Sequence, residues 1–117
     1  MIDPSALAPY REVMGTDADS FVIDLIDTFL GNSEHLVDAL YSSSAAGDLE
    51  TFTRSAHTLK SNSAVFGARL LSGLCLELET AGRSGRVLGL HPKIDQVKAE
   101  YKQVCQELAD LRQSLKV

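Results

Sequence analysis

Residues 49–66 read LETFTRSAHTLKSNSAVF, and the spacing of apolar and small side chains in this stretch decides the fold class. Such side chains recur every three or four residues, as on one face of an α-helix: Leu49, Phe52, Ala56, Leu59, Ser63 and Phe66. Asp48 is the expected N-cap of this helix, and Gly67 marks its expected end. By ideal helix geometry His57 lies about 130° away from the apolar face. We therefore expect its imidazole to face solvent.

The remaining sequence predicts three further amphipathic helices joined by short connections. One covers residues 17–44, with Thr16 or Asp17 as its N-cap, and it bends or divides at the Gly-Asn-Ser triplet of residues 31–33. Another begins near Leu71 and stops at the glycines of residues 82–85, and the last opens at Pro92. A short helix within residues 3–14 precedes them. We predict an all-α fold, an antiparallel up-down-up-down four-helix bundle with a short additional N-terminal helix, in which residues 1–117 form a single domain.

The composition excludes several classes of protein. Hydrophobic residues make up 44% of the 117 residues and charged residues 23%, which is typical of a soluble globular domain. The formal charge of −5 disfavours nucleic-acid binding, which depends on clustered Lys and Arg. No apolar run approaches the ~20 residues of a membrane span, and the N-terminus has no signal pattern. We expect a cytoplasmic monomer without membrane contact.

The sequence predicts neither a metal site nor a cofactor of the protein's own. Cys75 and Cys105 lack the C-x-x-C spacing of zinc and redox sites, so we interpret both as buried or half-buried thiols. The three histidines form no H-x-x-x-H pair, and no glycine-rich nucleotide loop or G-K-S/T motif is present. Autonomous kinase activity is therefore not expected. The glycines at positions 82, 85 and 89 are interpreted as turn formers.

His57 has neighbours that suit a nucleophile. Lys60 and Ser61 follow it by three and four residues, so both lie on the adjoining helical turn. A neutral imidazole has a lone pair that can attack phosphorus without a separate base. The Lys60 ammonium would stabilise phosphoryl oxygens, and the small Ser61 would leave room for the phosphoryl group. The sequence thus indicates an accessible histidine with a cationic partner.

Residues 56–68, AHTLKSNSAVFGA, closely resemble the A-H-x-L-K-G-S-S/A-x-x-x-G-A signature of histidine-containing phosphotransfer (HPt) domains. The resemblance continues on the next predicted helix, where the family has the pattern L-x-x-x-C-x-x-L-E-x-x-x-R and this chain has Leu71, Cys75, Leu78, Glu79 and Arg83. One position departs from the signature, because Ser61 replaces the usual glycine after the lysine. Serine is small enough to keep the histidine accessible.

The resemblance implies a phosphorelay carrier. It places the phosphoacceptor on His57 and the phosphate-supporting lysine on Lys60, with Ser61 beside them. Arg83 matches a basic position that lies near the phosphohistidine in some members of the family. Glu79 matches a position that is occupied by glutamine in some members. The alternative for these two residues is an i,i+4 surface pair. The implied partners are receiver domains of response regulators and hybrid histidine kinases, which supply Mg²⁺, so that the carrier needs no cofactor.

Two alternative functions are a non-phosphorylated interaction module and a di-metal enzyme. The chain could be a non-phosphorylated helical interaction module that docks receiver domains, although such a module has no need for the pair of His57 and Lys60. A di-metal four-helix enzyme would need inward carboxylates with E-x-x-H pairs, whereas Glu34 and His35 are adjacent and lie on different faces. The sequence is compatible with a free-standing protein and with a module of a hybrid sensor kinase.

Overall fold

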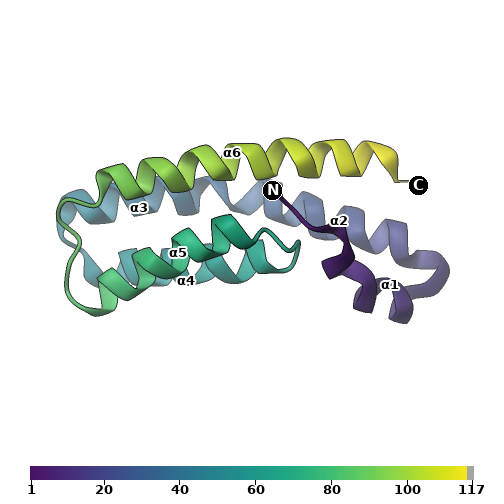
Figure 1. The fold of residues 1–117 in the computed structure, drawn as a ribbon, viewed down its shortest axis with the longest axis horizontal. Helices are drawn as coiled ribbons and strands as arrows, with labels where there is room; N and C mark the ends of the chain where they lie inside the picture. The colour runs from purple at the N-terminus through teal and green to yellow at the C-terminus, as the bar shows by residue number, and fades with distance from the viewer. Residues whose placement is uncertain (116–117) are drawn as a thin grey trace.

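The computed structural model describes residues 1–115, in which helices are joined by short turns (Figure 1). Its main elements are α1 (Ala8–Met14), α2 (Ala18–Asn32), α3 (Glu34–Ala46), α4 (Leu49–Ala64), α5 (Arg69–Arg83) and α6 (His91–Ser114). Short 3₁₀ segments, Pro4–Leu7 and Gly15–Asp17, flank α1. The last two residues of the expected 1–117 domain lie outside the described residues.

The helices form an elongated bundle of 47 × 22 × 19 Å. In Figure 1, α2 and α3 run in line, and α4, α5 and α6 each reverse the direction of the helix before them. The hairpin of α4 and α5 packs beside α3 and the first half of α6, while α1 folds back against α2. This arrangement confirms the predicted up-down-up-down four-helix bundle with a short N-terminal helix. Within residues 1–115, no helix has the length and apolar character needed to cross a bilayer.

The first long helix is divided where the sequence predicted a weak point. The division lies at Ser33, between α2 and α3, and this residue is fully buried. Its hydroxyl donates a hydrogen bond of 2.6 Å to the carbonyl oxygen of Phe29. A serine that bonds back to the preceding turn often bends a helix. The Ser33 hydroxyl therefore gives the interruption a physical cause.

The ends of the helices agree only in part with the sequence. Asp48 caps α4 as predicted, because its carboxylate accepts a 3.1 Å hydrogen bond from the Thr51 amide. The prediction of a side-chain cap at Thr16 or Asp17 is wrong, since α2 continues from a 3₁₀ turn and its N-cap residue Asp17 makes no side-chain cap bond. Gly67 lies in the turn that follows α4 and has a φ of +65°. A Cβ atom at this position would lie 2.7 Å from the Cβ of Asp3.

The core joins all the long helices. Phe29 of α2 contacts Phe66 after α4 and Tyr101 of α6, with ring centroids 5.6 and 6.0 Å apart. The stripe predicted on α4 faces this core with one exception. Leu49 is 39% exposed, because the first turn of α4 lies at the end of the bundle beside the loop that precedes α6. Its assignment to the core was wrong.

Gly82 is a second correction. The third bundle helix ends within residues 82–85 as predicted, because the last residue of α5 is Arg83. Gly82 itself, interpreted as a turn former, is instead the buried penultimate residue of this helix. Gly85 and Gly89, in contrast, have φ values of +79° and +75° and lie in the loop after α5, as predicted. The periodicity of the sequence does not distinguish a glycine in the last turn of a helix from a glycine in the loop that follows it.

We predict that Leu59→Ala and Leu49→Ala will differ sharply in stability. Leu59 is fully buried, so its truncation should cost about 2–5 kcal/mol of unfolding free energy. For the partly exposed Leu49 the cost should be about 0.5 kcal/mol or less. Urea denaturation followed by circular dichroism measures both. Equal losses would mean that the first turn of α4 packs into the core after all.

Candidate functional site

His57 lies in the middle of α4 and points out of the bundle, as predicted. Its side chain is 54% exposed, and its Nδ1 atom lies 3.0 Å from Oε2 of Glu79 on the neighbouring helix α5. None of the hydrogen bonds described among residues 1–115 involves the second ring nitrogen, Nε2. The site is thus a half-exposed imidazole with one side held by a carboxylate.

Glu79 is the centre of this site. Its side chain is only 4% exposed, and it accepts hydrogen bonds from three basic residues. Lys60 Nζ lies 2.7 Å from Oε1, and Arg83 donates to Oε2 from Nη2 at 2.6 Å and from Nε at 3.2 Å. Together with His57, these residues satisfy both carboxylate oxygens. A buried carboxylate is tolerated when it is paired and hydrogen-bonded in this way.

The donors around Glu79 keep it ionised. The hydrogen bond from Lys60 is the largest cause and, with those from Arg83 and His57, lowers the pKa of the Glu79 carboxyl to about 2, although its burial acts in the opposite direction. An ionised carboxylate can only accept hydrogen bonds. The proton of a neutral His57 ring must therefore reside on Nδ1. This tautomer leaves Nε2 unprotonated, with a lone pair, on a side chain that is 54% exposed.

The structure brings together four of the five residues that the sequence singled out. His57, Lys60, Glu79 and Arg83 form one hydrogen-bonded cluster. Ser61 is exposed on α4, one turn after His57, and is not among the described hydrogen-bond partners of the cluster. Arg83 does form the i,i+4 pair with Glu79 that was one of its two interpretations. This pair is not a surface pair, however, because Glu79 is buried against α4 and contacts His57.

The link that Glu79 makes among the other three residues was not predicted from the sequence. The spacing of residues on α5 does place Glu79 beside the apolar face of this helix. The buried residues of α5 include Leu71, Cys75, Leu78, Glu79 and Gly82. An acidic residue that continues an apolar stripe is a signal for a buried charge, and such charges need partners. The partners come from α4, so the register between the two helices was also required.

The two thiols have structural surroundings. Burial raises the pKa of the Cys75 thiol to about 12, and it also raises the pKa of the half-buried Cys105 thiol. Both therefore remain protonated at neutral pH, as expected for structural cysteines. Among residues 1–115, no cluster of three or more His, Cys, Asp or Glu side chains could hold a metal ion.

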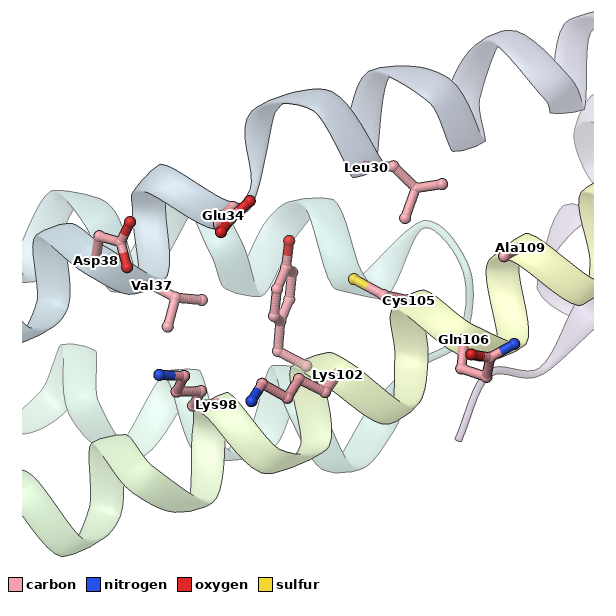
Figure 2. A pocket seen from close by; sticks show the side chains of 10 residues that line it. Leu30, Glu34, Val37, Asp38, Lys98, Lys102, Cys105, Gln106 and Ala109 are labelled. Carbon is pink, nitrogen blue, oxygen red and sulfur yellow. The ribbon is translucent and has the colours of Figure 1, made fainter.

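A groove of about 440 Å³ lies between α6 and the α2–α3 pair, away from His57 (Figure 2). Glu34 and Asp38 lie along one side, and Lys98 and Lys102 along the other, as Figure 2 shows. The Nζ atom of Lys98 also lies 5.7 Å from the centre of the Tyr41 ring. None of the four clustered residues lines this groove. The groove is therefore separate from the histidine site.

Comparison with known proteins places the chain in a family. The Hpt domain family matches residues 24–114, and the chain belongs to this family. It is 30% identical to the phosphorelay protein LuxU of Vibrio cholerae over 87 residues, which cover 74% of this chain and 77% of LuxU. The crystal structure of histidine-containing phosphotransfer protein B (HptB) from Pseudomonas aeruginosa PAO1 is similar with a TM-score of 0.83 and 32% identity. That match covers 98% of this chain and 96% of HptB. The family predicted from residues 56–68 is confirmed.

We predict that Glu79 makes the stability of the protein depend on acid. Folding lowers its pKa from 4.5 to about 2, so the unfolded chain binds a proton first as the pH falls. The stabilisation is complete above about pH 4.5 and disappears as the pH falls toward 2. Between about pH 6 and pH 3 the wild-type protein should lose about 2 kcal/mol more unfolding free energy than Glu79→Gln. Urea denaturation at both pH values measures this difference, and equal losses in the two proteins would contradict it.

Proposed function

We propose that this protein is a phosphorelay carrier that accepts a phosphoryl group on His57 from a receiver-domain phosphoaspartate and passes it to the aspartate of another receiver. One observation carries the proposal: Nδ1 of His57 is held by the ionised Glu79, so the exposed Nε2 has a free lone pair. Membership of the Hpt family and the similarity to the phosphorelay protein LuxU support the same function.

The proposed transfer uses Nε2 as the nucleophile. Its lone pair forms a bond to phosphorus while the bond between phosphorus and the aspartyl oxygen breaks, and that electron pair leaves with the receiver's carboxylate. The ring of His57 then carries a positive charge, which is shared with the Nδ1–H group that donates to Glu79. In the second transfer, a carboxylate oxygen of the next receiver attacks phosphorus and the electron pair returns to Nε2. No proton has to be removed in either direction.

Lys60 and Arg83 are the cations proposed to support the phosphoryl group. The Lys60 side chain is 28% exposed and the Arg83 side chain 66%, so both cations are partly accessible to solvent. Each is bound to Glu79 in the unphosphorylated protein, and each has further N–H groups to donate to phosphoryl oxygens. Ser61 is proposed to leave space for the group and to offer a hydroxyl donor.

The partners and setting of the carrier follow from this chemistry. We propose receiver domains of response regulators and hybrid histidine kinases as partners, with Mg²⁺ held by the receiver's carboxylates and no cofactor of the carrier's own. The protein is further proposed to act as a cytoplasmic monomer without autonomous kinase activity, either free-standing or as part of a hybrid histidine kinase. A non-phosphorylated module that only docks receivers is the alternative, and labelling of His57 separates the two.

Incubation of the full chain with a phosphorylated cognate receiver should give a phosphoprotein that is stable in alkali and labile in acid, as expected for phosphohistidine. His57→Gln should abolish the label, because it removes the nucleophilic nitrogen. His35→Gln, which changes an exposed histidine on α3, is the matched control and should be labelled like the wild type. A label that survives in His57→Gln, or no label in a wild-type protein that still binds the receiver, would contradict the proposal.

Lys60→Ala should slow phosphotransfer at least about tenfold, which corresponds to about 1.4 kcal/mol of lost transition-state stabilisation. Rapid-quench measurements of receiver dephosphorylation give the rate, and circular dichroism should show unchanged helix content. Lys102→Ala on α6 is the matched control, because this exposed lysine lies in the groove of Figure 2. If Lys60→Ala transfers at the wild-type rate, or loses much of its helix content, the electrostatic role of Lys60 is wrong.

A further inference from the structure

The helices α4 and α5 approach each other closely at Gly82. A Cβ atom at this position would lie 2.3 Å from Oγ1 of Thr53, 3.1 Å from Cδ1 of Phe52 and 3.3 Å from Cβ of Thr53. Carbon atoms that are not bonded prefer separations of about 3.5–4.0 Å. Rotation of the Thr53 side chain would relieve only the first contact. Phe52 is fully buried and has little room to move. Glycine is therefore the residue that fits this spacing.

This close approach lies one turn away from the histidine site. Thr53 precedes His57 by four residues on α4, and Gly82 follows Glu79 by three residues on α5. Helices α4 and α5 run antiparallel (Figure 1). The contact of Thr53 with Gly82 and that of His57 with Glu79 are therefore successive contacts along one interface. A change in helix spacing at the first contact is transmitted to the second.

We propose that Gly82 and Thr53 are positioning residues, whose contact sets the spacing of α4 and α5 at which Glu79 reaches Nδ1 of His57. This inference rests on the proposed function, because it concerns which ring nitrogen is free to accept the phosphoryl group. With Thr53 in its present rotamer, a Cβ at residue 82 would require a movement of about 1 Å to restore ordinary contacts. With Thr53 rotated away, the contacts with Phe52 and with Cβ of Thr53 would still require a movement of a few tenths of an ångström. Either movement would lengthen and weaken the 3.0 Å contact between Nδ1 and Oε2.

The effect of such a movement is selective. Arg83 and Glu79 belong to the same helix, so their hydrogen bonds do not depend on the spacing of α4 and α5. Lys60 has a long flexible side chain that can follow Glu79. His57 has a short side chain with two rotatable bonds, and its ring cannot extend to follow the carboxylate. A wider interface would therefore release the histidine and leave the ion pairs of Glu79 in place.

The test compares Gly82→Ala with Gly73→Ala on the same helix, where a Cβ would meet nothing within 4 Å. The first readout is the ¹⁵N NMR spectrum of the His57 ring, assigned with His57→Gln and recorded at about pH 8, where an ordinary imidazole is neutral. The second is the rate of phosphotransfer from a phosphorylated receiver. For Gly82→Ala we expect a mixture of ring tautomers and a rate at least about tenfold lower. Gly73→Ala should match the wild type in both readouts.

The double variant Gly82→Ala with Thr53→Ala removes the shortest of the three contacts. It should recover the Nδ1–H tautomer and most of the transfer rate, and it remains informative if Gly82→Ala alone fails to fold. A Gly82→Ala protein with wild-type tautomer and rate would overturn the inference, as would a folded double variant that keeps the full defect. The NMR readout needs no phosphorylation. Failure of the proposed function would instead appear as a wild-type protein that is not labelled.

Discussion

The burial of the Glu79 carboxylate between α4 and α5 is the constraint on which the site depends. A charged group with 4% of its side chain exposed is stable only with donors close by, and Lys60, Arg83 and His57 provide them. The need for donors thus fixes the orientation of all three basic side chains. It also fixes the protonation of the ring, because an ionised carboxylate has no proton to give. One buried charge therefore organises the half-exposed ring of His57, the proposed nucleophile.

Glu79 is buried because α4 and α5 pack closely against each other. The small residue Gly82 on α5 lets this helix approach Thr53 and Phe52 on α4. Glu79 is 4% exposed at this interface, and its described hydrogen bonds are made to protein groups. On another side of the bundle, α6 and the α2–α3 pair leave an open groove. The charged residues Glu34, Asp38, Lys98 and Lys102 along that groove are exposed.

The sequence predicted the outward direction of His57 because periodicity fixes the faces of a single helix. It also predicted the division near Ser33 and the cap at Asp48, since both arise from local chemistry. The sequence did not predict that Leu49 is partly exposed, that Gly82 is part of a helix, or that Glu79 contacts the other three residues of the site. In each case the outcome depends on what another helix covers, and a helical wheel contains no information about the register between helices. The resemblance to the HPt signature predicted the family and singled out residues that the structure brings together, but it did not predict the contacts among them.

The charges of the site explain how a carrier can both accept and release a phosphoryl group. In the unphosphorylated protein, Glu79 contributes one negative charge, and Lys60 and Arg83 contribute two positive ones, so the cluster with a neutral ring has an excess of one positive charge. A phosphoryl group on Nε2 brings up to two negative charges, and the ring gains one positive charge because Nδ1 keeps its proton. The excess positive charge is then close to zero. Without Glu79, the same two cations would hold a phosphoryl dianion more strongly and slow its release. In the proposed mechanism, the buried carboxylate offsets part of the positive charge that attracts the phosphoryl group, and this brings the free and the phosphorylated states closer in free energy.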